Sequence, residues 1–78
     1  MDFQRKEVTM SNPKNKYSII VFLESGKPKK WQYVHKLNGM AMYLNKMHPT
    51  WMYFNVYDRR SGQYLKRFKR NEFVPDFI

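Results

Sequence analysis

The sequence contains no cysteine. Disulfides therefore cannot support the fold, and thiolate metal ligands are excluded. A chain of 78 residues builds only a thin core, and domains of this size usually need a further source of stability, such as large aromatic side chains or self-association. The lack of cysteine fits a reducing compartment, and we expect a cytoplasmic protein.

Long hydrophobic runs are also missing. The longest apolar stretch, Ile19 to Leu23, is far shorter than the ~20 apolar residues that cross a bilayer. The first nine residues, MDFQRKEVT, contain no hydrophobic signal core. The predicted helix has few cations on its polar face, unlike helices that lie on membranes. We therefore expect a soluble protein that is not secreted and does not bind membranes.

Groupings of residues that carry catalysis are absent as well. His35 and His48 bracket a predicted helix about 18 Å long, at ~1.5 Å per residue, so they cannot share a metal ion. The acidic residues are scattered, the serines have no adjacent base, and the three glycines are isolated rather than arranged in a phosphate-binding loop. The sequence predicts a protein that is not an enzyme and holds no metal or cofactor.

Acidic residues are scarce, and charge is the strongest compositional signal. The chain carries 15 Lys and Arg against 6 Asp and Glu, a net charge of +9. The segment 27–70 is more basic still, because Asp58 is its only acid. Such a field attracts nucleic acid, anionic lipid or acidic proteins. The alternative is that the charge serves only solubility.

Residues 1–15 are polar and show no periodicity, which predicts a flexible arm followed by one domain over residues 16–78. A β-branched and aromatic stretch predicts a central strand over 16–23, and a second strand is expected over 29–34. Gly26 in the intervening turn is expected to adopt a positive φ. Together these two strands form a hairpin.

A helical stripe follows, made of Leu37, Met40, Ala41, Leu44 and Met47. The helix is expected to begin at Lys36 or Asn38, with Asn38 as N-cap, and to end before Pro49. Strands are predicted over 51–57 and 63–68, joined by a turn with positive φ at Gly62. The apolar end of the chain, 73–78, should dock on the core or on a partner.

The fold class is therefore α+β with the order ββαββ, a four-stranded, mainly antiparallel sheet and one helix packed on one face. The second and third strands run in the same direction, either as parallel neighbours or with the first or last strand between them. In both cases the hairpin tips lie at opposite ends of the sheet.

Basic residues alternate with aromatic residues on these strands. In 51–57 the apolar Met52, Phe54 and Val56 should face the helix, which leaves Trp51, Tyr53 and Tyr57 on the open side. That side would also carry Trp31 or Tyr33 and some of Tyr64, Lys66 and Phe68. An open sheet face with rings and cations is typical of proteins that bind single-stranded nucleic acid, because the rings stack on bases and the cations neutralise phosphates.

The leading hypothesis is therefore a non-enzymatic module that binds single-stranded DNA or RNA. Trp51, Tyr53 and Tyr57 would stack on bases, and the phosphate contacts would come from Lys27, Lys29, Lys30, Arg59, Arg60, Lys66, Arg67, Lys69 and Arg70. A basic two-stranded ribbon entering a duplex groove is another possibility.

The same basic and aromatic surface also suits roles that involve no nucleic acid. The alternative function is a small protein-binding regulator or inhibitor that docks an acidic surface of a cellular enzyme, through the open face or the segment 73–78. The same face could instead form a homodimer, or its rings could simply complete a thin core.

No family signature is present. The chain lacks the second helix and the glycine-aromatic strings of the RNA-recognition motif, and it lacks the terminal helices of the double-stranded-RNA-binding fold. A small, basic, cysteine-free domain is similar in general character to accessory proteins of bacterial viruses, many of which bind nucleic acid or inhibit a host enzyme.

Overall fold

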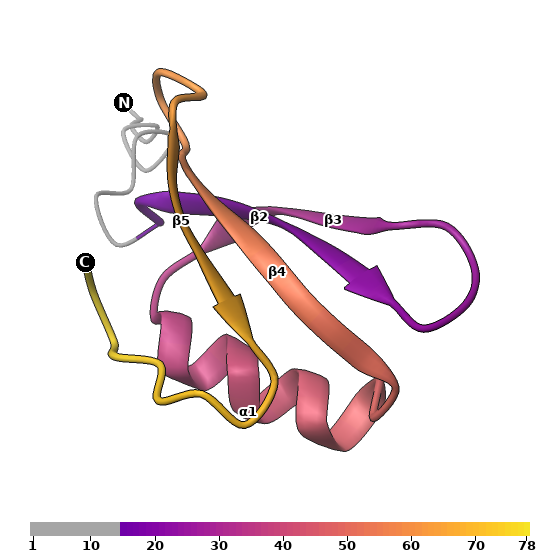
Figure 1. Cartoon of the computed structure of the whole chain (residues 1–78). Helices are drawn as coiled ribbons and strands as arrows, with labels where there is room; N and C mark the ends of the chain where they lie inside the picture. The colour runs from indigo at the N-terminus through magenta and orange to yellow at the C-terminus, as the bar shows by residue number, and fades with distance from the viewer. Residues whose placement is uncertain (1–14) are drawn as a thin grey trace, which may run out of the picture.

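The computed structural model describes residues 15–78. Its elements follow one another as β2 (Tyr17–Leu23), β3 (Lys29–Val34), α1 (Leu37–Met47), β4 (Trp51–Asp58) and β5 (Tyr64–Lys69), as Figure 1 shows. This order confirms the predicted α+β class and its ββαββ succession. The arm predicted over residues 1–15 lies, apart from Asn15, outside the described residues.

The four strands form one sheet in the order β3-β2-β4-β5, and all three neighbouring pairs are antiparallel. Strand β2, the first strand within the described residues 15–78, therefore lies between the two strands that α1 connects. This settles the order that the sequence left open. Strand β2 is apolar on both faces, as suits a central strand. The edge strands β3 and β5 carry several lysines, which discourage pairing with further strands.

Helix α1 covers one face of this sheet (Figure 1). It contributes Leu37, Ala41 and Leu44 to the core, which they share with side chains from every strand. The fully buried members from the strands include Ile19 and Val21 of β2 and Phe54 and Val56 of β4. Each such side chain stabilises the fold by about 1.5–3 kcal/mol. The core therefore lies between the helix and one side of the two central strands.

The predicted side-chain alternation of β4 is wrong at its first residues. Leu23 pairs with Trp51 and Phe22 with Tyr53, so Met52 is an extra residue that forms a β-bulge. A bulge shifts the alternation of the strand by one position. Trp51 consequently points toward α1 and is 1% exposed, whereas Met52 is 42% exposed. The indole Nε1 of Trp51 donates a hydrogen bond to Asn45 Oδ1 of the helix at 2.8 Å.

The helix begins at Leu37, next to Lys36, the first of the two predicted starts, but the predicted N-cap Asn38 is wrong. Its N-cap is Lys36, which makes no side-chain capping bond. Asn38 lies inside the helix, and its side-chain amide donates instead to the carbonyl of Val74 at 2.9 Å. The amide of Leu37 donates to the carbonyl of Asp76 at 2.8 Å. The carbonyl of Asp76 thus accepts from a backbone amide at the start of the helix, a role that a capping side chain would otherwise fill.

The C-terminal segment docks on the core, one of the two outcomes expected for it. Val74 is 3% exposed. The hydroxyl of Tyr17 donates to the carbonyl of Ile78 and accepts from its amide, both at 3.0 Å. In Figure 1 this segment runs beside α1. Its two ends are thereby fixed to α1 and to β2.

The two hairpin tips lie at opposite ends of the sheet, as predicted (Figure 1). Both tips contain a glycine with positive φ, +91° at Gly26 and +77° at Gly62, a conformation that glycine adopts without steric cost. Over residues 15–78 no helix has the length and apolar character needed to cross a membrane.

Candidate nucleic-acid interface

The sheet surface opposite α1, here called the open face, follows from the strand register. Ile19 and Val21 are buried under the helix, so the residues that alternate with them in β2 face the other way. Their cross-strand partners face the same way. The open face accordingly comprises Ser18, Ile20 and Phe22 of β2, Lys30 of β3, Tyr53, Asn55 and Tyr57 of β4, and Tyr64, Arg67 and Lys69 of β5.

A row of planar groups crosses the open face at Tyr53. Phe22 stacks on Tyr53 with ring centroids 4.8 Å apart and an angle of 25° between the planes. The guanidinium of Arg67 lies 4.2 Å from the centroid of the same ring. Because β2 and β5 flank β4 on opposite sides, the two groups approach Tyr53 from opposite sides. We call this arrangement the Tyr53 row.

Arg67 is held in place by a second contact. Its Nε donates to Asn55 Oδ1 at 2.9 Å, and Asn55 is only 8% exposed. The two terminal amino groups of the guanidinium have no hydrogen-bond partner among residues 15–78. Arg67 is itself exposed. The open face thus presents a fixed, planar cation with free donors, a geometry suited to phosphate or to the face of a base.

A second group of rings lies toward the other end of the open face. Tyr57 and Tyr64 meet edge to face, with centroids 5.9 Å apart. Nearby, the guanidinium of Arg59 lies 5.3 Å from the ring centroid of Tyr33, and Arg59 Nε donates to the carbonyl of Asn15. Tyr33 rather than Trp31 is therefore the exposed aromatic of β3, with an exposed fraction of 65%.

The structure brings together five of the residues predicted to contact nucleic acid. Lys30, Tyr53, Tyr57, Arg67 and Lys69 share the open face. Lys27 and Arg60 are exposed at the two hairpin tips.

Three of the other predicted residues do not lie on this face. The prediction that Trp51 stacks on bases from the open face is wrong in its placement, because the bulge at Met52 turns the ring into the core. Lys29 and Lys66 pair with Val21 and Val56 and so lie on the helix side of the edge strands.

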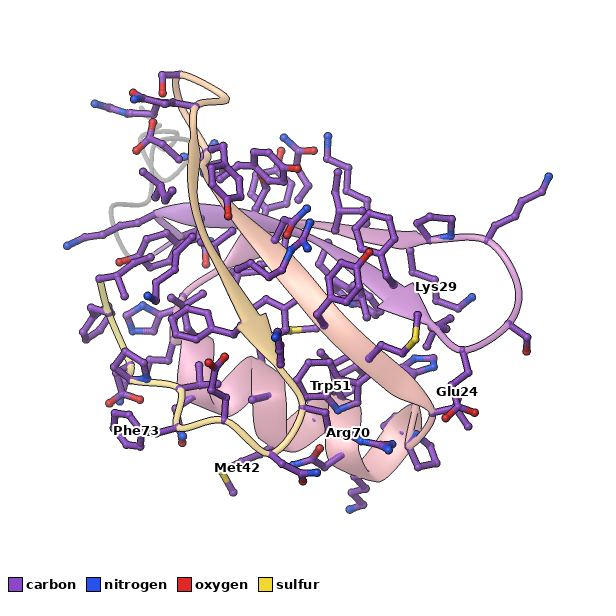
Figure 2. The ribbon with its side chains drawn as sticks, in the orientation of Figure 1. Glu24, Lys29, Met42, Trp51, Arg70 and Phe73 are labelled. Carbon is purple, nitrogen blue, oxygen red and sulfur yellow. The ribbon has the colours of Figure 1, made fainter. Side chains whose placement is uncertain are left out.

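Arg59 and Arg70, the remaining predicted cations, are engaged in contacts within the fold. Arg59 packs on the ring of Tyr33, and Arg70 Nη1 donates to the carbonyl of Pro49. Figure 2 shows Arg70 near the end of the sheet where β4 begins, with Trp51 between the strand and the helix. Phe68, one of the optional open-face residues, is 2% exposed and belongs to the core.

Two contributors to the open face, Phe22 and Asn55, are not indicated by the sequence pattern. Phe22 was assigned to a central strand without a role, although its alternation with Ile19 and Val21 places it opposite the core. The sequence pattern predicts no role for Asn55 beyond its place in the strand 51–57. Its function as the acceptor for Arg67 depends on the pairing of β4 with β5 at this position, which the sequence does not encode locally.

The described titratable groups include no cluster that could hold a metal ion, and two of them, His48 and Asp58, make contacts within the fold. No three His, Cys, Asp or Glu residues between 15 and 78 lie close enough to hold a metal ion. His48 packs against the rings of Trp31 and Tyr43, at centroid distances of 5.7 and 6.0 Å. Asp58 accepts a hydrogen bond from the amide of Ser61 at 2.8 Å, which chiefly accounts for the lowering of the pKa of its carboxyl.

No family model, curated protein or solved structure matches this chain.

Proposed function

We propose that this protein binds single-stranded DNA or RNA through the open face, without catalysis. The observation that carries the proposal is Arg67, an exposed guanidinium fixed between Tyr53 and Asn55 with its terminal amino groups unpaired within residues 15–78. An arginine usually loses conformational freedom when it binds a ligand. Here its orientation is already set, which lowers the entropic cost of binding.

The chemistry of the Tyr53 row suits a flexible strand with exposed bases. Phe22 and Arg67 engage the Tyr53 ring from its two sides, so a base would stack on the outer side of the row, for example on the exposed guanidinium plane of Arg67. A base that stacks on an aromatic ring gains about 1–3 kcal/mol. The lysines at positions 30 and 69 flank the row with further positive charge. A base-paired duplex keeps its base faces covered by stacking, so this surface favours single strands over duplex DNA.

The hairpin tips extend the basic surface beyond the sheet. Lys27 at one tip and Arg60 at the other are exposed, and the tips lie at opposite ends (Figure 1). A strand that crosses the open face lengthwise would therefore meet cations at both ends of its path. Each phosphate contact releases counterions, so binding should weaken steeply with salt.

The test is fluorescence anisotropy of labelled single-stranded DNA, RNA and duplex DNA over a series of salt concentrations. We expect saturable binding of the single strands with a linear log–log salt slope. Arg67→Ala should weaken binding about tenfold, because it removes a charge-assisted contact and a stacking plane. The matched control is Lys46→Ala, which removes one positive charge from the last turn of α1, on the other side of the sheet.

The two variants distinguish binding through the specific geometry of Arg67 from binding through net positive charge. If binding depends only on net charge, Arg67→Ala and Lys46→Ala will weaken it to the same small extent. That result, or the absence of binding at low salt, would reject the proposal. The alternative, an acidic protein partner, would then be favoured.

A further inference from the structure

A hollow lies on the open face between the two hairpins. It has a volume of about 240 Å³ and is lined by Ser18, Ile20, Lys30, Tyr57 and Gly62. Pockets for drug-sized molecules usually measure about 300–1,000 Å³. This hollow is smaller, and it is open to solvent on one side. Its size suits one small planar ring rather than a larger ligand.

One residue that lines the hollow carries a polar group with no partner among residues 15–78. Ser18 is only 6% exposed, and its hydroxyl has no hydrogen bond to any residue of the described chain 15–78. Buried polar groups are nearly always hydrogen-bonded, so a buried, unpaired hydroxyl that borders a cavity indicates a place for a ligand or water. A hydroxyl both donates and accepts, which allows it to pair with the polar edge of any nucleobase.

The other lining residues supply an aromatic ring, a positive charge and a stretch of backbone without a side chain. Tyr57 contributes a ring that is steadied by its edge-to-face contact with Tyr64. Lys30 brings a cation from β3, where it pairs with Ile20. Gly62 contributes only backbone to the rim, so no side chain at this position closes the entrance. A planar ring with a polar edge and an attached anion matches all of these features.

We infer that the hollow is a binding site for one nucleotide, with the base against Tyr57 and Ser18 and the phosphate near Lys30. The nucleotide is one unit of a bound strand, so the inference rests on the proposed function. The hollow would add a defined nucleotide-binding site to a surface that otherwise attracts any single strand. A base bound in the hollow would lie at a fixed distance from the Tyr53 row.

The test uses nuclear magnetic resonance of the ¹⁵N-labelled protein. Uridine 5′-monophosphate, adenosine 5′-monophosphate and inorganic phosphate are titrated separately, and the amide shifts of Ser18, Ile20 and Gly62 are followed. We expect saturable shifts of these three amides with the nucleotides. Phosphate alone should leave Ser18 unaffected. Equal shifts with phosphate would show a simple anion site and would overturn the inference.

Ser18→Ala tests the role of the hydroxyl. It should weaken nucleotide binding about three- to tenfold, as expected for one lost hydrogen bond. Thermal stability should stay the same or rise, because the hydroxyl has no partner within residues 15–78 and its removal leaves none unpaired. The matched control is Ser25→Ala in the β2–β3 turn, which should leave nucleotide affinity unchanged. Equal affinity in the wild type and Ser18→Ala would overturn the inference.

These measurements separate the inference from the proposed function. If oligonucleotides bind with a steep salt dependence but the three amides do not respond to nucleotides, the hollow is not a site and the proposed function stands. If the amides respond and oligonucleotides do not bind, the hollow takes free nucleotides and the proposed function is rejected. If neither ligand binds, both ideas fail.

Discussion

At the scale of single residues, Trp51 and Tyr53 show that aromatic residues close together in the sequence can lie on opposite sides of a sheet. Both were assigned to stacking from the sequence, because strict alternation places them on one face. The bulge at Met52 separates them. Trp51 is buried against α1, and Tyr53 lies in the row on the open face. A bulge depends on the pairing of two distant segments, so local sequence patterns do not reveal it.

Trp51→Phe should therefore affect stability and not binding. The smaller ring leaves a gap in the core, and the hydrogen bond to Asn45 is lost, so we expect a cost of about 1–3 kcal/mol. For a domain of this size, 1 kcal/mol lowers Tm by roughly 4–8 °C. Thermal unfolding measures the loss, and oligonucleotide anisotropy below the transition should be unchanged. Weaker binding at an unchanged Tm would contradict the buried position.

At the scale of elements, the bounds of the strands and the helix were largely predictable. Periods of two and of three to four residues distinguish strand from helix, and Pro49 marks the end of α1. The start of α1 was less predictable. Asn38 resembled an N-cap, but its side-chain amide donates to the carbonyl of Val74, and the acceptor for the amide of Leu37 is the carbonyl of Asp76. The contact joins segments far apart in the chain.

The turn between β4 and β5 gives a pH-dependent prediction. Hydrogen bonds from the amide of Ser61, and next from its hydroxyl, lower the pKa of Asp58 from the usual 3.8. The unfolded chain then binds the proton more tightly than the folded chain. This carboxylate consequently stabilises the fold above pH 3.8, and the contribution disappears as the pH falls through the lowered pKa.

The measurement is Tm as a function of pH between about 5 and 2, for the wild type and Asp58→Asn. Asparagine retains an oxygen that accepts from Ser61 but does not titrate. The Tm of the wild type should fall more steeply toward acid than the Tm of the variant. Parallel curves would mean that the turn does not distinguish the charged carboxylate from the neutral amide.

At the scale of the whole molecule, the strand order was not predictable from the chain. Connection lengths allowed several orders, and only the pairing of β2 with both β3 and β4 selects one. That order decides which side chains share the open face, because Phe22 and Arg67 meet at Tyr53 only when β4 lies between β2 and β5. The sequence therefore predicted that the open face is aromatic and basic. It did not predict which of these side chains contact one another.

The C-terminal segment also contributes to the whole molecule, because its hydrogen bonds join α1 to β2. Val74 and Phe73 are adjacent but differ in environment, with exposed fractions of 3% and 80%. In Figure 2, Phe73 points away from the body of the molecule. Val74→Ala should cost about 1–2 kcal/mol through lost burial and the cavity left behind.

Phe73→Ala is the matched control, since it removes a larger side chain and yet should change the free energy of unfolding by less than about 0.5 kcal/mol. Urea unfolding of both variants measures the difference. If Val74 holds the segment on the core, a single cooperative transition will shift to lower urea in Val74→Ala only. If Phe73→Ala proves the more destabilising, the segment packs in the opposite orientation, with Phe73 inward. The carbonyl of Val74 would then no longer be the acceptor for Asn38, and the start of α1 would need another partner.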